Sequence, residues 1–208
     1  MKAQITFCIG IRDVSERFES ILLKSLKPIR EKVLLSVYDM GSCEEETHKQ
    51  MNSLDGFNYF YQREEANMFS RTRSLNMAAG NSKSNYLFFC DVDIAIPGNF
   101  IKEYFQNVCP NKVWFPIVWS QYKDKPVKIG DNSTGWYRKT GFGMMGATKE
   151  NFNQIKYDET LKYWGLEDQR FFNKSKKKKF QIVRRQSQLV HYWHPKDTDW
   201  HLGKGNNK

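Results

Sequence analysis

The feature that most constrains the fold is a regular alternation of apolar runs and helical patterns through the first ninety residues. Residues 4–11 and 32–37 form continuous apolar runs, which are typical of strands buried on both faces of a parallel sheet. Between them, apolar side chains recur at helical spacing from 14 to 26, and Pro28 is expected to end that helix. A helix at 44–51, a strand at 57–61, a helix at 68–79 and a strand at 86–90 continue the order. This alternation predicts a mostly parallel α/β sheet with ligands at the carboxyl ends of its strands.

The pattern is less regular beyond residue 97. We expect a helix at 99–108, a strand at 113–119, a polar loop at 123–139, helices at 149–155 and 166–174, and a closing pair of strands at 180–183 and 187–191. The sequence therefore predicts one compact domain whose second half is a smaller β/α region, followed by a flexible tail at 196–208.

Composition excludes several classes of protein. Aromatic residues make up 15% of the 208 residues, too many for a disordered chain. No stretch approaches the ~20 apolar residues of a membrane span, and the first residues lack the apolar core of a signal peptide. The four cysteines form no C-x-x-C pair, so we expect reduced packing residues. These features predict a cytoplasmic protein.

The net charge of +10 is concentrated at the C-terminal end. From Arg170 onward, eleven Lys and Arg residues face only Asp197 and Asp199. The run Lys176, Lys177, Lys178 and Lys179 is most simply a solvated face, and peripheral attachment to an anionic membrane at the inner face of the plasma membrane is the next interpretation. Nucleic acid is not expected as a partner, because the aromatic residues are not interleaved with the basic run.

Two carboxylates, Asp91 and Asp93, alternate where an apolar strand ends. A turn at this point lets one carboxylate bind a hard divalent cation while the other reaches a ribose or a neighbouring group. The plain alternative is an ordinary pair of acids in a turn. His191 and His194 can converge on one ion if their strand bends, or they are simply surface or core histidines.

The segment around Trp164, Glu167 and Asp168 places two adjacent acids after an aromatic residue and a glycine, at an expected helix start. Acids in a first helical turn complement the helix dipole, which is the plain interpretation. The functional interpretation is a general base in a sugar site, with Trp164 as a platform for a pyranose ring.

Four segments in order resemble the beta-1,4-galactosyltransferase family and its bacterial relatives of capsule and lipooligosaccharide synthesis, which have the GT-A fold. FSRTRSLN at 69–76 resembles the family's F-N-R-A-K-L-L-N, and DVDIAIP at 91–97 resembles D-V-D-L-I-P. GMMGATKENF at 143–152 and WGLED at 164–168 resemble G-G-V-S-A-L-(S/T)-K-x-x-F and W-G-G-E-D. The likeness covers most of the chain and implies a Rossmann-like central sheet.

The resemblance implies a UDP-sugar donor and a role for each matching residue. Arg12 and Asp39 would contact the uridine, and Asp91 would support the nucleotide. Arg71 would pair with the diphosphate, which suits the fork of donors on a guanidinium group. By the same likeness, residues 1–97 would bind the nucleotide sugar and residues 98–195 would bind the acceptor and catalyse transfer.

The resemblance also implies a metal site and a catalytic base. Asp93, His191 and His194 would bind Mn²⁺, with Mg²⁺ as the alternative, and this mixed set of donors suits a first-row divalent metal. Asp168 would be the base, Glu167 would bind the acceptor, and Trp164 would close over the sugar and contact both substrates.

The expected function is thus an inverting, metal-dependent transferase that moves galactose or N-acetylgalactosamine from a UDP-sugar to a glycan or lipid-linked glycan. Bacterial surface polysaccharide synthesis is the expected pathway. Leu166 replaces a family glycine, and Thr140 stands near the family's donor-selecting tyrosine, so N-acetylglucosamine and glucose stay open. Two other classes also stay open: a metal-dependent phosphodiesterase or nuclease, and a non-catalytic carbohydrate-binding module.

Overall fold

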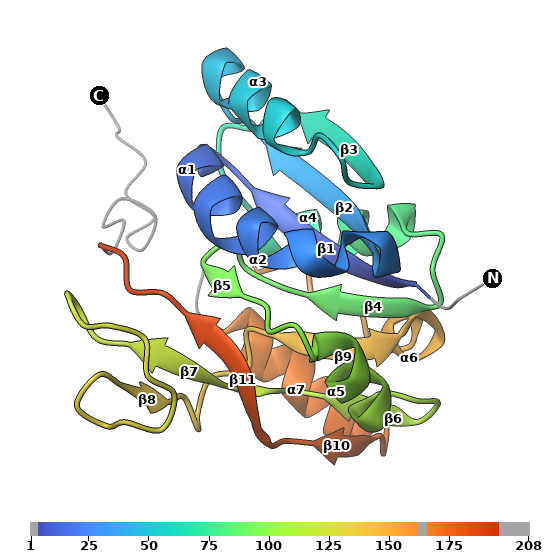
Figure 1. Ribbon diagram of the computed structural model, residues 1–208. Coiled ribbons are helices and arrows are strands. Elements are labelled where there is room, and N and C mark those ends of the chain that lie inside the picture. Colours follow the sequence, from blue (N-terminus) through green and yellow to red (C-terminus); the bar gives the residue numbers. More distant parts are fainter. Residues whose placement is uncertain (1–3, 162–165, 196–208) are drawn as a thin grey trace, which may run out of the picture.

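The computed structural model describes residues 4–161 and 166–195, which form two sheets with helices packed around them (Figure 1). The larger sheet has seven strands in the order β10-β6-β9-β4-β1-β2-β3. The smaller sheet has four strands in the order β5-β11-β7-β8. The expected α/β architecture with a mostly parallel central sheet is confirmed.

The first half of the chain builds the parallel part of the large sheet. Its strands are β1 (Ile5–Ile11), β2 (Val33–Met40), β3 (Tyr59–Glu64) and β4 (Tyr86–Phe89), and β1 pairs in parallel with both β2 and β4. The helices between them are α1 (Ser15–Arg17), η1 (Phe18–Leu23), α2 (Lys24–Leu26), η2 (Lys27–Lys32), α3 (Glu44–Ser53) and α4 (Arg71–Asn81).

The first helical stretch runs further than the sequence predicts. Its central part, η1, is a π-helix, and the chain continues through the 3₁₀ segment η2 to Lys32. Pro28 therefore does not end the helical stretch. It lies in the first turn of η2, where a missing backbone N–H breaks no hydrogen bond.

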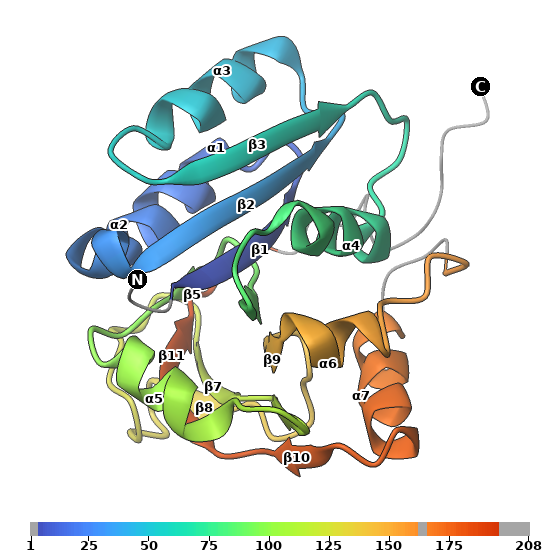
Figure 2. The same cartoon turned by 90° about the vertical axis from the view of Figure 1, so that its right-hand side faces the viewer.

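Side chains of β1 alternate between two hydrophobic cores. Phe7 and Ile9 join the core that contains Phe18 and Leu22 of η1, whereas Cys8 joins the core that contains Leu75 of α4. This is the period of two that a strand buried on both faces requires. Figure 2 shows α3 and α4 on opposite sides of β2 and β3.

The second half departs from the prediction at Pro116. The expected strand at 113–119 is two strands, β6 (Lys112–Trp114) in the large sheet and β7 (Ile117–Gln121) in the small one. Proline has no N–H for a ladder hydrogen bond, which explains the break between them. The expected loop at 123–139 also contains a short strand, β8 (Gly135–Tyr137), antiparallel to β7.

The predicted closing pair of strands is wrong in its pairing. β10 (Gln181–Val183) pairs with β6, whereas β11 (Gln186–His191) pairs with β7 and with β5 (Ile94–Ala95). Periodicity identifies strands but not their partners. The helices of this half are α5 (Phe100–Asn107), α6 (Lys149–Asn153) and α7 (Glu167–Lys177).

One further strand, β9 (Met145–Thr148), was not predicted. It runs antiparallel between β4 and β6 at the centre of the large sheet. A Cβ atom at Gly146 would lie 3.0 Å from atoms of Tyr104 and Val108, so only glycine fits easily there. Strands from both sides of residue 97 thus share one sheet. None of the helices within the described residues has the length and apolarity that a membrane crossing requires.

Candidate active site

The polar residues singled out from the sequence gather where parallel strands end. Figure 1 shows the arrowheads of β1, β2 and β11 pointing toward one edge of the molecule. Arg12 follows β1, Asp39 is the penultimate residue of β2, and Asp91 and Asp93 follow β4. His191 is the last residue of β11. This edge is the candidate active site.

Asp93, His191 and His194, here called the histidine cluster, come together because β5 pairs with the end of β11. His194 Nε2 lies 2.9 Å from Asp93 Oδ2, and His191 Nε2 lies 3.6 Å from the same oxygen. The backbone N–H of Tyr192 donates to the Asp93 carbonyl at 3.0 Å, which fixes the two segments. One ligand atom from each of the three side chains lies within 4.8 Å of the others.

The histidine cluster fits a divalent cation. Asp93 Oδ1 and His191 Nδ1 are buried and have no hydrogen-bond partner among the described residues. Burial raises the pKa of Asp93, but the hydrogen bond from His194 and the nearby imidazoles outweigh it and lower that pKa. Burial lowers the pKa of His191 and favours its neutral, metal-binding form. The set of one carboxylate and two imidazoles suits a first-row metal.

Arg71, Asp91, Glu167 and Asp168 form a second group, the arginine cluster. Arg71 is the first residue of α4 and is only 8% exposed. Its Nε donates to Asp91 Oδ1 at 3.1 Å, its Nη1 to Asp168 Oδ1 at 2.6 Å, and its Nη2 to the Gly143 carbonyl at 2.8 Å. Glu167 Oε1 lies 3.9 Å from Nη1. One guanidinium group therefore joins the end of β4 to the start of α7.

The arginine cluster bears on two predicted roles. Three carboxylates already surround Arg71, so contact with a diphosphate requires Asp91 or Asp168 to release part of the guanidinium group. Glu167 is only 4% exposed and offers little surface to an acceptor. Asp168 is 28% exposed and can be reached from solvent.

Asp91 is the carboxyl of this cluster with a raised pKa. Surrounding protein atoms raise the pKa of Asp91 to about 6, against the lowering effect of Arg71. Its side chain is 42% exposed, so water screens part of this effect. Asp91 therefore holds its proton more readily than an isolated aspartate does.

Asp39 is fully buried and has two local donors. Its Oδ1 accepts a hydrogen bond from the Ser42 backbone N–H at 3.0 Å, and its Oδ2 accepts one from the Tyr61 hydroxyl. Burial and this hydrogen bond raise the pKa of Tyr61. Tyr61 was not predicted as part of the edge, although it lies beside Val37 on the neighbouring strand. The predicted uridine contact of Asp39 must therefore share these oxygens with Ser42 and Tyr61.

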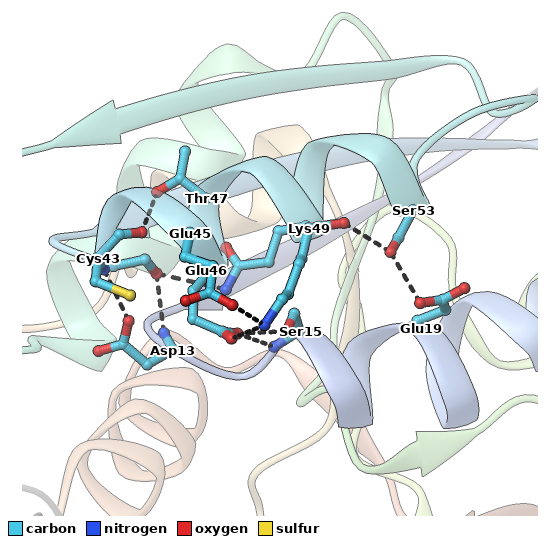
Figure 3. A network of polar contacts seen from close by, with 11 residues as sticks. Asp13, Ser15, Glu19, Cys43, Glu45, Glu46, Thr47, Lys49 and Ser53 are labelled. Carbon is cyan, nitrogen blue, oxygen red and sulfur yellow. Dashed lines mark hydrogen bonds and ion pairs between the residues drawn. The ribbon is translucent and has the colours of Figure 1, made fainter.

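A polar network fixes the loop that carries Arg12 (Figure 3). The Asp13 N–H donates to Ser42 Oγ at 2.9 Å, and the Cys43 N–H donates to Asp13 Oδ1 at 2.8 Å. The Ser15 N–H donates to Glu46 of α3 at 3.3 Å. The loop after β1 is thereby tied to the start of α3. The Arg12 side chain is held at the edge with 21% exposure.

Sequence reasoning missed a support behind the arginine cluster. Arg184 donates to the carbonyls of Arg138 and Gly141 at 3.2 and 2.8 Å, and its guanidinium carbon lies 4.4 Å from the centre of the Phe142 ring. These contacts hold the segment that ends at Gly143. No motif marked Arg184. Trp164, the predicted sugar platform, lies outside the described residues.

The sequence matches the family described as chondroitin N-acetylgalactosaminyltransferase over residues 11–207. Human chondroitin sulfate synthase 3 is 27% identical over 207 residues, which cover 90% of this chain and 23% of that protein. Mouse chondroitin sulfate N-acetylgalactosaminyltransferase 1 is 33% identical over 146 residues, which cover 62% of this chain and 28% of that protein. The chain thus spans about a quarter of the length of these relatives.

Solved structures share the fold at low sequence identity. S. aureus TarS 1-349 in complex with UDP-GlcNAc superposes with a TM-score of 0.69 at 14% identity, over 93% of this chain and 60% of that one. The Pyrobaculum calidifontis mannosyltransferase PcManGT with GDP-Man and Mn²⁺ gives 0.68 at 11% identity, over 95% and 59%. The catalytic domain of Drosophila beta1,4galactosyltransferase 7 with xylobiose gives 0.61 at 17% identity, over 99% and 77%.

These findings confirm the resemblance at the level of enzyme class and fold. The neighbours are glycosyltransferases with the GT-A fold, and a beta-1,4-galactosyltransferase is among them. The narrower bacterial group is not shown, because the matching family is named for chondroitin N-acetylgalactosaminyltransferase and both relatives named above are mammalian. The chain belongs to the chondroitin N-acetylgalactosaminyltransferase family of glycosyltransferases.

Proposed function

We propose that this chain transfers a sugar from a UDP-sugar to a glycan hydroxyl with inversion at the anomeric carbon. N-acetylgalactosamine is the first candidate because the family and a relative are named for it, and galactose is the second. One observation carries the proposal: the Asp168 carboxylate is held by buried Arg71 at the same sheet edge as the histidine cluster.

Asp168 is our proposed general base. Its Oδ1 forms an ion pair with Nη1 of Arg71 at 2.6 Å, which fixes the orientation of the side chain. Because Arg71 binds Oδ1, we assign Oδ2 to receive the proton of the acceptor hydroxyl. The acceptor oxygen then bonds to the anomeric carbon as the bond between that carbon and the UDP oxygen breaks. Because Asp168 takes the proton during the attack, a neutral hydroxyl can act as the nucleophile at neutral pH.

Asp93, His191 and His194 would hold a divalent cation, with Mn²⁺ as the first candidate and Mg²⁺ as the second. When bound, such an ion offsets the negative charge of the diphosphate leaving group. A structural neighbour is described with Mn²⁺, and the buried, unpartnered Asp93 Oδ1 supports a cation here as well. Arg12, Asp39 and Asp91 would orient the nucleotide at the adjoining strand ends.

The acceptor that we propose to test first is a chondroitin oligosaccharide, because the relatives are named for chondroitin. A bacterial surface polysaccharide, a cytoplasmic location and membrane contact through Lys176, Lys177, Lys178 and Lys179 remain predictions. Glu167 and Trp164 remain the predicted acceptor-side residues.

The test is UDP release from a panel of UDP-sugars with a chondroitin oligosaccharide, first with Mn²⁺ and then with EDTA. We expect metal-dependent release that favours one sugar and an inverted product by NMR. No release from any sugar, together with no UDP binding by calorimetry, would contradict the proposal. Metal-dependent cleavage of a phosphodiester in the same preparation would favour the hydrolase alternative.

A further inference from the structure

Three exposed aromatic side chains lie on the small sheet beyond the histidine cluster. Tyr122, Trp136 and Trp193 are 41%, 43% and 39% exposed. The rings of Tyr122 and Trp136 are stacked, with centroids 5.1 Å apart and planes inclined by 27°. We call these three residues the aromatic face. Large exposed aromatic groups that gather at one place commonly mark a binding surface.

The strand register places the aromatic face beside the candidate metal site. His191 of β11 pairs with Ser120 of β7, and Ser120 pairs with Trp136 of β8, so all three side chains point to one side of the sheet. Tyr122 follows Ser120 by two residues, and its ring stacks on Trp136, which places it on the same side. Trp193 follows His191 by two residues, and its backbone N–H donates to Gln121 Oε1 at 3.1 Å, next to Tyr122 in the chain. The backbones of Trp136 and His191 lie two strand spacings apart, which is about 10 Å.

A buried polar atom lies between the two sites. Ser120 Oγ is buried and has no hydrogen-bond partner among the described residues, just like His191 Nδ1 beside it. Such atoms are costly to leave unsatisfied, and a bound polar molecule can satisfy them. The row from His191 through Ser120 to Trp136 is therefore continuous, with unsatisfied polar groups at one end and an aromatic stack at the other.

The surroundings of the aromatic face are basic. The segment 122–139 carries Lys123, Lys125, Lys128, Arg138 and Lys139 against Asp124 and Asp131. Lys123 Nζ lies 5.3 Å from the centre of the Trp193 ring. Asp131 Oδ1 accepts hydrogen bonds from the Ser133 N–H and hydroxyl. The excess of positive charge favours an acidic ligand.

Rings of this kind suit a sugar chain. A pyranose presents a flat face of C–H groups that packs on an aromatic ring, while its hydroxyls bond to the polar edges of Tyr and Trp. Carboxylate or sulfate groups on the sugar would lie near Lys123. We propose that Tyr122, Trp136 and Trp193 bind an acidic glycan chain through sugars beyond the one that reacts. This inference rests on the proposed function and adds a second contact with the acceptor, outside the candidate active site.

The first test measures binding alone, without donor or turnover. A fluorescent chondroitin decasaccharide is titrated with the wild type, Trp136→Ala, Trp136→Phe and the control Tyr59→Ala. Tyr59 is 44% exposed and lies on β3, an edge strand of the large sheet. We expect Trp136→Ala to weaken binding about tenfold, the scale of one lost aromatic contact. Trp136→Phe should recover most of the affinity, and Tyr59→Ala should match the wild type.

The second test uses the donor that releases UDP most readily. With the decasaccharide as acceptor, Tyr122→Ala and Trp136→Ala should raise KM about tenfold and leave kcat unchanged. With a disaccharide acceptor, KM should rise much less than with the decasaccharide, because a short acceptor offers fewer sugars to the aromatic face. A failure of the proposed function would appear differently, as no UDP release from the wild type with either acceptor.

Three results would overturn the inference. The first is wild-type decasaccharide binding by Trp136→Ala. The second is equal affinity for a neutral chito-oligosaccharide of the same length, which would remove the assignment of an acidic glycan. The third is a wild-type dimer in solution that Trp136→Ala converts to a monomer without changing glycan binding, which would make the aromatic face an interface between copies of the chain.

Discussion

The arginine cluster and the histidine cluster lie at the same sheet edge but differ in how their polar groups are satisfied. In the arginine cluster, a buried guanidinium group donates from all three of its nitrogens to Asp91, Asp168 and the Gly143 carbonyl. In the histidine cluster, Asp93 Oδ1 and His191 Nδ1 are buried without a partner in the described part of the chain. The first cluster is complete as folded, whereas the second retains capacity for a cation.

This difference separates positioning from binding. A carboxylate that is fixed by a buried arginine is aligned before substrate arrives, which is what a general base requires. A group with unused lone pairs gains stability only when its ligand binds. Variants in the arginine cluster should therefore lower the free energy of unfolding with or without metal. Variants in the histidine cluster should lower it mainly when metal is present.

The largest expected effect is on turnover, from Asp168→Asn. An amide cannot take the acceptor proton, so kcat should fall by about 10²–10⁴-fold while UDP affinity by calorimetry stays near wild type. Asp158→Asn is the control, since Asp158 bonds to Thr160 outside the site. Wild-type turnover by Asp168→Asn would show that the base lies elsewhere.

Next in size is the loss of folding stability in Arg71→Met. Removing the cation leaves the buried Glu167 and the partly exposed Asp91 and Asp168 uncompensated, so the free energy of unfolding in urea should fall by about 3 kcal/mol, the low end for breaking a buried pair. Arg73→Met changes the same residue type on the same helix, but Arg73 is 45% exposed and paired with Glu64. It should cost less than about 1 kcal/mol. Equal losses of unfolding free energy in the two variants would show that Arg71 stabilises the fold no more than an exposed arginine does.

The histidine cluster should respond to metal instead. Mn²⁺ at about 100 times its Kd should add about 2.7 kcal/mol to the free energy of unfolding, and EDTA should remove the gain. His191→Ala should abolish the gain with little change in the metal-free protein. His48→Ala, at a side chain that is 71% exposed, should keep it. The same gain in His191→Ala and wild type would place the cation elsewhere.

The smallest expected effect tests the support behind the arginine cluster. Arg184→Met removes the donors to the Arg138 and Gly141 carbonyls and the contact with Phe142. We expect a loss of about 1–2 kcal/mol in unfolding free energy and a modest fall in kcat, because the Gly143 carbonyl loses its fixed position. Arg185→Met, at the exposed neighbour, is the matched control. No difference between the two would make Arg184 dispensable.

The sequence predicted the first half of the fold well because its strands are continuous apolar runs separated by helical periods. It failed at β9, whose residues Met-Gly-Ala-Thr include two small side chains that carry little strand preference. It also assigned wrong partners to β10 and β11, since pairing depends on contacts that periodicity does not encode. The break at Pro116 was readable in principle, because proline cannot donate to a ladder.

Some features of the candidate active site were also predictable from the sequence, and others were not. The residue types of Asp93, His191 and His194 indicated a metal, and the structure brings them together through the pairing of β5 and β11. The contact between Arg71 and Asp168 joins positions 97 residues apart, and no local sequence pattern predicts it. Sequence motifs thus marked the chemical groups, but the partners that fix each group depend on the fold.

The central place of β9 has a consequence for synthesis of the chain. Until residue 148 has left the ribosome, β4 lacks its neighbour on one side, and the apolar edge of Leu87, Phe88 and Phe89 is open to solvent. An unpaired apolar edge is a site where nascent chains associate wrongly. About sixty residues must be translated between β4 and its partner, which takes several seconds at ordinary elongation rates. The chain is therefore expected to depend on chaperones during that interval more than at any later stage.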